Sequence, residues 1–144
     1  RLMGDEVVLA VPPDHPFARR ERIAVMELRD QSLVLREEGS GTRRSVEAAL
    51  ATTGIVLPKD SVTLVLGSTQ AVLQAVAQGL GLGFVSSKAS AQAQEDRHVA
   101  CVGLEGVDLR RDLYLAYLPQ KTGDPLVARF LDFVRGRFGE GDDA

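Results

Sequence analysis

The sequence has one cysteine, no tryptophan and two histidines, His15 and His98. A lone cysteine, Cys101, cannot form a disulfide within the chain, which is typical of proteins from a reducing compartment. Two histidines without cysteine partners disfavour a structural zinc site. We therefore expect no metal, no cofactor and a cytoplasmic location.

Long apolar runs and excess positive charge are also missing. No run approaches the roughly 18 residues that a membrane-spanning helix needs, and residues 1–4 lack the apolar core of a signal peptide. Lysine and arginine number 17 against 20 aspartates and glutamates, for a net charge of -3. The chain thus lacks the basic surface that binding to a nucleic-acid backbone requires. We expect no membrane association and no DNA binding by this chain alone.

The residues that are present describe an ordinary globular protein. The chain has 144 residues, of which 44% are hydrophobic and 26% charged. This length allows one domain or two small lobes. The first residue is not methionine and a strand-like run follows almost at once, so we expect the sequence to be cut from something longer.

Hydrophobic periodicity predicts alternating strands and helices. The first strand, Glu6–Val11, stops at two prolines, which cannot donate to a β-ladder. Further strands are predicted at 33–35, 62–66, 82–85, 99–102 and 111–118, and helices at 41–53, 69–80, 89–95 and 126–138. Such alternation favours an α/β fold with parallel pairing through right-handed crossovers. We expect both faces of 111–118 to be covered, with the last helix packed on this strand.

The distribution of these elements predicts two unequal lobes. Residues 13–103 suffice for a complete α/β lobe, here lobe II. Residues 1–12 and 104–144 form lobe I, which offers only two strands and one helix and needs more sheet from a missing segment or another chain. The two lobes would be joined by crossings near Pro12 and between Gly103 and Leu109.

Hydroxyl-bearing turns follow three of the predicted strands. In parallel sheets such turns meet at the carboxyl edge, where helix N-termini favour an anion. The alternative is that the hydroxyls only cap helices. Because three such turns coincide at one edge, we favour a ligand. The first turn is not a Walker loop, because the glycine spacing and the lysine are absent. The candidate effector-binding residues are Ser40, Gly41 and Thr42 in the first turn, Ser68 and Thr69 in the second, and Ser86 in the third.

Catalytic motifs are scarce. There is no Gly-x-Ser-x-Gly elbow, no His-Glu-x-x-His and no phosphate loop with a lysine, so we expect no enzymatic activity. The helix at Thr69–Leu80 is apolar around much of its circumference. It is either a central core helix or one that also lines a homodimer interface.

Four stretches carry a family resemblance, among them Leu35-Arg36-Glu37-Glu38-Gly39-Ser40-Gly41-Thr42-Arg43 and Gly79-Leu80-Gly81-Leu82-Gly83-Phe84-Val85-Ser86. With residues 6–18 and 66–68, they resemble the effector-binding domain of LysR-type transcriptional regulators nearly end to end. The first stretch is most similar to regulators of carbon fixation and of sulfur and nitrogen assimilation.

This resemblance implies two Rossmann-like lobes of the periplasmic-binding-protein type II fold, with lobe I incomplete and a small effector between the lobes. It also implies homodimers or tetramers that use a helix similar to Thr69–Leu80, and DNA binding only through an N-terminal winged helix-turn-helix that this sequence lacks. Two alternatives remain open. One is a solute-binding protein of a transport system, and the other is a two-lobed enzyme of the deaminase or transferase type.

Overall fold

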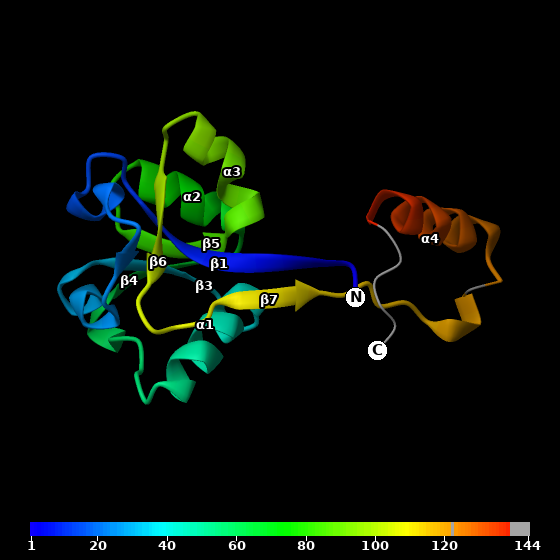
Figure 1. Cartoon of the computed structure of the whole chain (residues 1–144), viewed down its shortest axis with the longest axis horizontal. Helices are drawn as coiled ribbons and strands as arrows, with labels where there is room; N and C mark the ends of the chain where they lie inside the picture. Colours follow the sequence, from blue (N-terminus) through cyan, green and yellow to red (C-terminus); the bar gives the residue numbers. More distant parts are fainter. Residues whose placement is uncertain (122, 139–144) are drawn as a thin grey trace. The chain divides into compact units, whose positions relative to one another are not determined.

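A mixed β-sheet with helices on both faces organises most of the chain (Figure 1). The computed structural model describes residues 1–121 and 123–138. It forms two units: residues 6–110, and residues 1–5 with the described residues from Arg111 on. The strands are β1 (Met3–Val11), β2 (Arg22–Ile23), β3 (Leu33–Arg36), β4 (Val62–Leu66), β5 (Leu82–Ser86), β6 (Ala100–Leu104) and β7 (Arg110–Leu113). The helices are α1 (Gly41–Thr52), α2 (Thr69–Ala77), α3 (Ser87–Glu95) and α4 (Pro125–Phe138), with short 3-10 turns η1 (Pro16–Arg19), η2 (Val25–Asp30), η3 (Lys59–Ser61) and η4 (Pro119–Lys121).

The strand order in the unit of residues 6–110 is β2-β6-β1-β5-β3-β4. β3 is parallel to both β4 and β5, as expected for strands joined through helices. β1 runs antiparallel to its neighbours β5 and β6. The sheet therefore combines parallel crossover units with one antiparallel strand in its middle.

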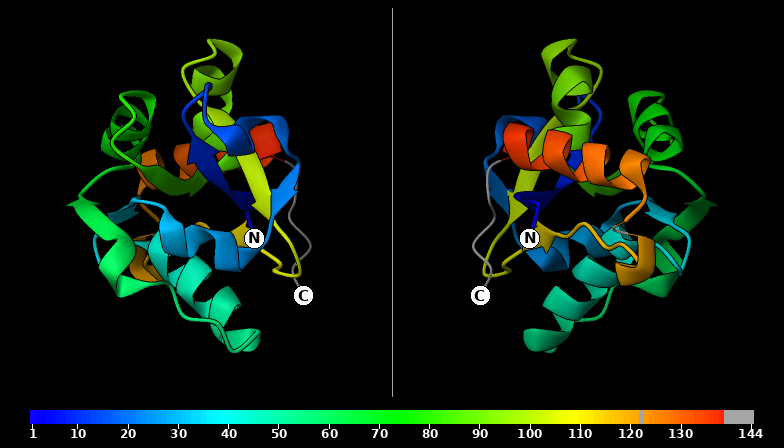
Figure 2. Two further views of the ribbon diagram at one scale, coloured as in Figure 1. Left: turned by 90° about the vertical axis from the view of Figure 1, so that its left-hand side faces the viewer. Right: turned by 90° about the vertical axis from the view of Figure 1, so that its right-hand side faces the viewer.

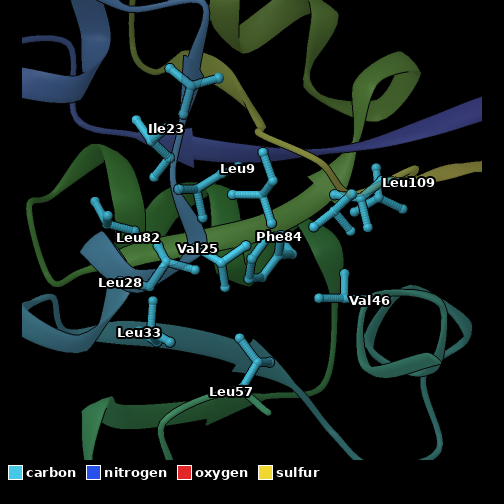
Figure 3. Packing of buried hydrophobic residues seen from close by; sticks show 14 of the residues in the cluster. Leu9, Ile23, Val25, Leu28, Leu33, Val46, Leu57, Leu82, Phe84 and Leu109 are labelled. Atoms are coloured by element: carbon cyan, nitrogen blue, oxygen red, sulfur yellow. The ribbon is translucent and has the colours of Figure 1, made fainter. Parts of the chain in front are cut away.

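Each face of this sheet buries its own hydrophobic cluster. The cluster on the α1 face includes Leu9, Leu33, Leu50 and Phe84, of which Phe84 is the most exposed at 3% (Figure 3). The cluster on the other face joins β-strand residues to Val72 and other side chains of α2. Figure 2 shows α1 on one side of the sheet and α3 on the other. The central strands β3 and β5 are buried on both faces, which explains their nearly continuous apolar sequences.

Close packing of α2 on β5 depends on a glycine. A Cβ atom at Gly83 would lie 2.5 Å from Cγ1 of Val72 and 3.1 Å from the carbonyl oxygen of Val34. The 2.5 Å contact is sterically excluded and the 3.1 Å contact is tight, so α2 packs this closely on β5 only with a glycine at position 83.

The helix predicted from Thr69 to Leu80 ends three residues early, at Ala77. Gly79 takes a φ of +74°, its N–H donates to the Val76 carbonyl, and the N–H of Leu80 donates to the Ala75 carbonyl. These two bonds form a Schellman motif, which terminates a helix at a glycine in the left-handed region.

The last predicted strand is also shorter than expected. β7 ends at Leu113, although the sequence predicts a strand to Leu118 with both faces covered. Tyr114 is 70% and Leu118 59% exposed, so that expectation of coverage is wrong for these residues. The reason is that, within the described residues, β7 pairs with β1 alone, and this pairing ends with the hydrogen bond from the N–H of Leu2, just before β1, to the carbonyl of Leu113. In α4, Leu131 and Val134 are buried.

The two units divide at other positions than the crossings predicted from the sequence. The division falls between Asp5 and Glu6 and between Arg110 and Arg111. Residues 6–11 lie with the larger unit because β1 pairs there with β5 and β6. The assignment of residues 1–12 and 104–144 to lobe I, and of 13–103 to lobe II, remains a prediction.

Candidate functional site

The candidate site lies at the carboxyl edge of three adjacent strands. β5, β3 and β4 are neighbours and run parallel, so the chain leaves all three at the same edge of the sheet. The three following turns lead directly into α3, α1 and α2. We call this edge the rim. It places the six predicted residues on one side of the larger unit, namely Ser40, Gly41, Thr42, Ser68, Thr69 and Ser86.

Two of the rim serines cap helices. The Ser68 Oγ accepts a hydrogen bond from the Ala71 N–H at 3.1 Å, and the Ser86 Oγ accepts one from the Ala89 N–H at 3.3 Å. The capping role that competes with ligand binding is therefore real at these positions. At Ser68 this role does not exclude a ligand, because a hydroxyl that accepts one bond still carries a proton to donate.

The first turn is built differently. Ser40 occupies the N-cap position of α1 but makes no side-chain capping bond, and it is only 5% exposed. Thr42 is also buried, and a Cβ atom at Gly41, where the helix begins, would meet nothing within 4 Å. Burial of two hydroxyls at a helix start, without the usual cap at Ser40, makes this turn the strongest part of the site.

An arginine that the sequence prediction did not assign to the site joins two of the turns. Arg36, the last residue of β3, donates from Nη1 to the Oγ1 of Thr69 at 2.9 Å. Its Nε and Nη2 donate to the Glu37 carboxylate at 2.8 and 2.9 Å. The Arg36 side chain is 18% exposed. The available signal in the sequence was the position of Arg36 directly before the turn that leads into α1. Its contact with Thr69 could not be predicted.

A second arginine supports the rim from α1. The Nη1 of Arg43 donates to the carbonyl oxygen of Arg36 at 3.1 Å, and its Nε lies 2.8 Å from the Glu47 carboxylate. Both guanidinium groups thus have acidic partners from this chain. An anion at the rim would compete with Glu37 for Arg36, since both offer oxygen acceptors to the same donors.

Below the rim the packing is apolar. A cavity of about 10 Å³ lies among Leu35, Val46, Leu57 and Phe84, with both rim arginines at its border. Figure 3 shows Val46, Leu57 and Phe84 pointing into this region from α1, the segment before η3, and β5. The space fits about one water molecule. A ligand would therefore lie on the rim and not beneath it.

The arginine contact changes the titration of Glu37. Hydrogen bonds from Arg36 lower the pKa of the Glu37 carboxyl below its ordinary value. Because the folded pKa is depressed, the stabilising contribution is present at neutral pH and is lost as the pH falls through the folded pKa. The group is exposed, so we assign no energy to this effect.

We expect Arg36→Gln to raise the pKa of Glu37. The physical reason is the loss of the two charge-assisted hydrogen bonds that favour the ionised carboxylate. The measurement is an NMR titration of the Glu37 side-chain carboxyl carbon across the acidic range. Arg44→Gln, which removes an arginine near the start of α1, serves as control. An unchanged Glu37 titration in Arg36→Gln would contradict the pairing.

The described residues contain neither a metal-ligating cluster nor a membrane helix. No group of three or more His, Cys, Asp or Glu side chains in residues 1–121 and 123–138 could hold a metal ion. In the same residues, no helix combines the length and apolar character needed to cross a membrane. The Cys101 thiol lies 3.5 Å from the Ser90 hydroxyl, and burial raises its pKa.

Comparisons with known proteins agree on one family. The family model described as the LysR substrate binding domain matches residues 1–139. A RuBisCO operon transcriptional regulator of Allochromatium vinosum is 35% identical over 133 residues, which are 92% of this chain and 43% of that protein. The transcriptional regulator CysL of Bacillus subtilis is 32% identical over 82% of this chain and 38% of its own length. The chain thus spans about two fifths of these relatives.

A solved structure shows the same fold. The regulatory domain of CcmR from Synechocystis PCC6803, in complex with 2-PG, matches 96% of this chain and 65% of its own with a TM-score of 0.81 and 26% identity. The effector-binding domain of QuiR in complex with shikimate matches with a TM-score of 0.67 and 18% identity. At this low identity the match supports the fold and nothing more. The expected α/β fold is confirmed, and the alternative of a transport protein gains no support. The chain belongs to the LysR substrate-binding domain family.

Proposed function

We propose that this chain is the effector-sensing part of a LysR-type transcriptional regulator and that its rim binds a small anionic metabolite. The observation that carries the proposal is the meeting of three hydroxyl-bearing helix starts at one sheet edge, with Arg36 hydrogen-bonded to Thr69 between two of them. A structural relative has been solved with 2-PG. The chain would bind and signal without catalysing a reaction.

The chemistry of the rim favours an anion for three reasons. The N-termini of α1, α2 and α3 carry N–H groups without partners inside the helix, together with the positive ends of the helix dipoles. The hydroxyls of Ser40 and Ser68 add donors, and Thr42 and Ser86 lie at the same helix starts. Arg36 supplies a guanidinium that can exchange the Glu37 carboxylate for a ligand oxygen. Occupancy would shift the population of two conformations of the regulator only as far as the ligand binds them unequally.

We expect Thr42→Ala and Ser68→Ala each to weaken binding of an anionic probe by about tenfold or more, because a hydrogen bond to a charged group contributes roughly 1.5–3 kcal/mol. The measurement is isothermal titration calorimetry in the full-length regulator with 2-PG, and with inorganic phosphate and shikimate for comparison. Thr52→Ala is the matched control, because its hydroxyl bonds the Ala49 carbonyl at the far end of α1.

Unchanged affinity in both variants would remove these two turns from the site. If the Arg36→Gln variant bound the probe as tightly as the parent chain, this result would argue against an anionic ligand held by Arg36. Preference for shikimate over inorganic phosphate would favour a carboxylate ligand.

The assembly is also a proposal. We infer a homodimer or tetramer that uses the surface of α2 and the neighbouring edge strand β4, with DNA bound through a winged helix-turn-helix elsewhere in a cytoplasmic regulator. The structure changes the basis for this inference, because α2 buries Val72, Leu73, Ala75 and Val76 within its own unit. Its exposed side carries glutamines. The exposed apolar residues of this region are Leu64 and Val65 on β4 and Leu80 after α2.

A further inference from the structure

A cavity of about 230 Å³ opens along the flank of α1, between this helix and residues 55–62. It arises from the way the helix ends. Gly54 takes a φ of +72°, and the N–H of Ile55 turns back to the Leu50 carbonyl at 3.1 Å. The chain therefore returns beside α1 and leaves a space between them. None of the predicted rim hydroxyls lines this cavity.

The floor of the cavity is apolar and belongs to the core. Leu35, Leu50 and Leu57 line it and are 4%, 1% and 8% exposed. Side chains that border a void lose dispersion contacts on that side. An apolar group placed in the cavity would restore these contacts and remove further apolar surface from water.

The mouth of the cavity has one uncompensated cation. Arg43 and Glu47 both line it, but their 2.8 Å ion pair neutralises them mutually. Lys59 also lines it, is exposed, and forms no ion pair within the described part of the chain. A ligand with a negative head at the mouth would therefore meet a net positive charge.

We propose that this cavity is a second small-molecule site that takes a short carboxylic acid, with the alkyl chain on the leucine floor and the carboxylate at Lys59. The volume lies below the roughly 300–1,000 Å³ of pockets for drug-sized ligands, which restricts the occupant to a small molecule. The site shares no predicted hydroxyl with the rim, although Arg43 borders both, so its test is made at Lys59 and Ala51, which line only this cavity.

The test uses the whole chain, isotope-labelled at leucine and valine methyl groups, titrated with hexanoate and with its neutral isostere hexanamide. We expect saturable shifts at Leu50, Leu57 and Val62, with hexanoate binding more tightly than hexanamide. Lys59→Gln should weaken hexanoate by about two- to fivefold, the range for an exposed ion pair, and leave hexanamide unchanged. Lys121→Gln, at a lysine that does not line the cavity, is the matched control.

A second variant fills the space. Ala51 lines the cavity from an exposed position on α1, so Ala51→Phe should abolish the methyl shifts with both ligands while thermal unfolding shows a folded chain. Three results would overturn the proposal: no saturable shift with hexanoate, equal affinity for hexanoate and hexanamide that Lys59→Gln does not alter, or shifts that persist in Ala51→Phe.

Discussion

Arg111→Met is expected to lower the free energy of unfolding by about 3–5 kcal/mol, the cost of breaking a buried ion pair from one side. Arg111 on β7 donates from Nε to the Oδ2 of Asp5 on β1 at 2.9 Å, and its Nη2 lies 2.8 Å from the same oxygen. The Asp5 side chain is fully buried and that of Arg111 is 18% exposed. Removing the guanidinium leaves the buried Asp5 carboxylate without its cationic partner. Water cannot reach the carboxylate to replace that partner, so the loss is costly.

The measurement is urea unfolding of the single and double variants. Asp5→Leu combined with Arg111→Met should recover most of the loss, because an apolar pair of similar volume leaves no buried charge. The neighbouring Arg110 is the control, since it pairs with Asp108 at 2.7 Å with both side chains largely exposed. Arg110→Met should change stability by less than about 1 kcal/mol. Equal losses at the two arginines would show that burial of Asp5 does not decide the cost.

Gly83→Ala is expected to cost about 1–3 kcal/mol, the usual penalty for overpacking a core. The new methyl group would meet Cγ1 of Val72 at 2.5 Å and the Val34 carbonyl oxygen at 3.1 Å. Either α2 moves away from β5 or the strands shift, and both options separate buried apolar surfaces. Thermal or urea unfolding measures the loss.

A compensating change tests the cause. Val72→Ala removes the atom nearest to the added methyl, so the double variant Gly83→Ala with Val72→Ala should lose less than the sum of the two single variants. Gly67→Ala is the control, because its Cβ would meet nothing within 4 Å. Strict additivity of the two single losses would contradict a clash between α2 and β5.

Local patterns predicted most of the helices and strands correctly. Residues 62–66 and 82–85 are predicted as strands because they are short apolar runs bounded by turn residues, and the structure has β4 and β5 there; α1 ends where Gly54 indicates. These signals depend on neighbours in sequence. The end of β7 could not be predicted from neighbours in sequence. Residues 114–118 have strand-like composition, but among the described residues they have no strand to pair with.

The position of β1 depends on pairing between distant residues. The sequence identifies residues 6–11 as a strand but not as the antiparallel strand between β5 and β6. The predicted lobe boundary at Pro12 therefore differs from the division at Asp5 and Glu6. Periodicity says which residues form a strand, and only tertiary packing selects the neighbours.

The candidate site was predictable in outline and not in detail. Parallel strands followed by helices place Ser40, Ser68 and Ser86 on one edge by topology alone. Which hydroxyls cap a helix depends on local geometry, and Ser40 differs from the other two. The contact between Arg36 and Thr69 joins residues on different strand-to-helix turns, so no pattern in the local sequence predicts it.

The antiparallel place of β1 has a consequence for how the protein folds. Val7 pairs with Ser86 and Val11 with Ala100, so the partners of this strand lie far later in the chain. Closing such long loops is entropically costly and slows folding. Among the described strands, β1 is synthesised before both of its partners, β5 and β6, so its pairing cannot be completed until Val102 has been made. Until then, its apolar side chains are exposed to chaperones and to other nascent chains.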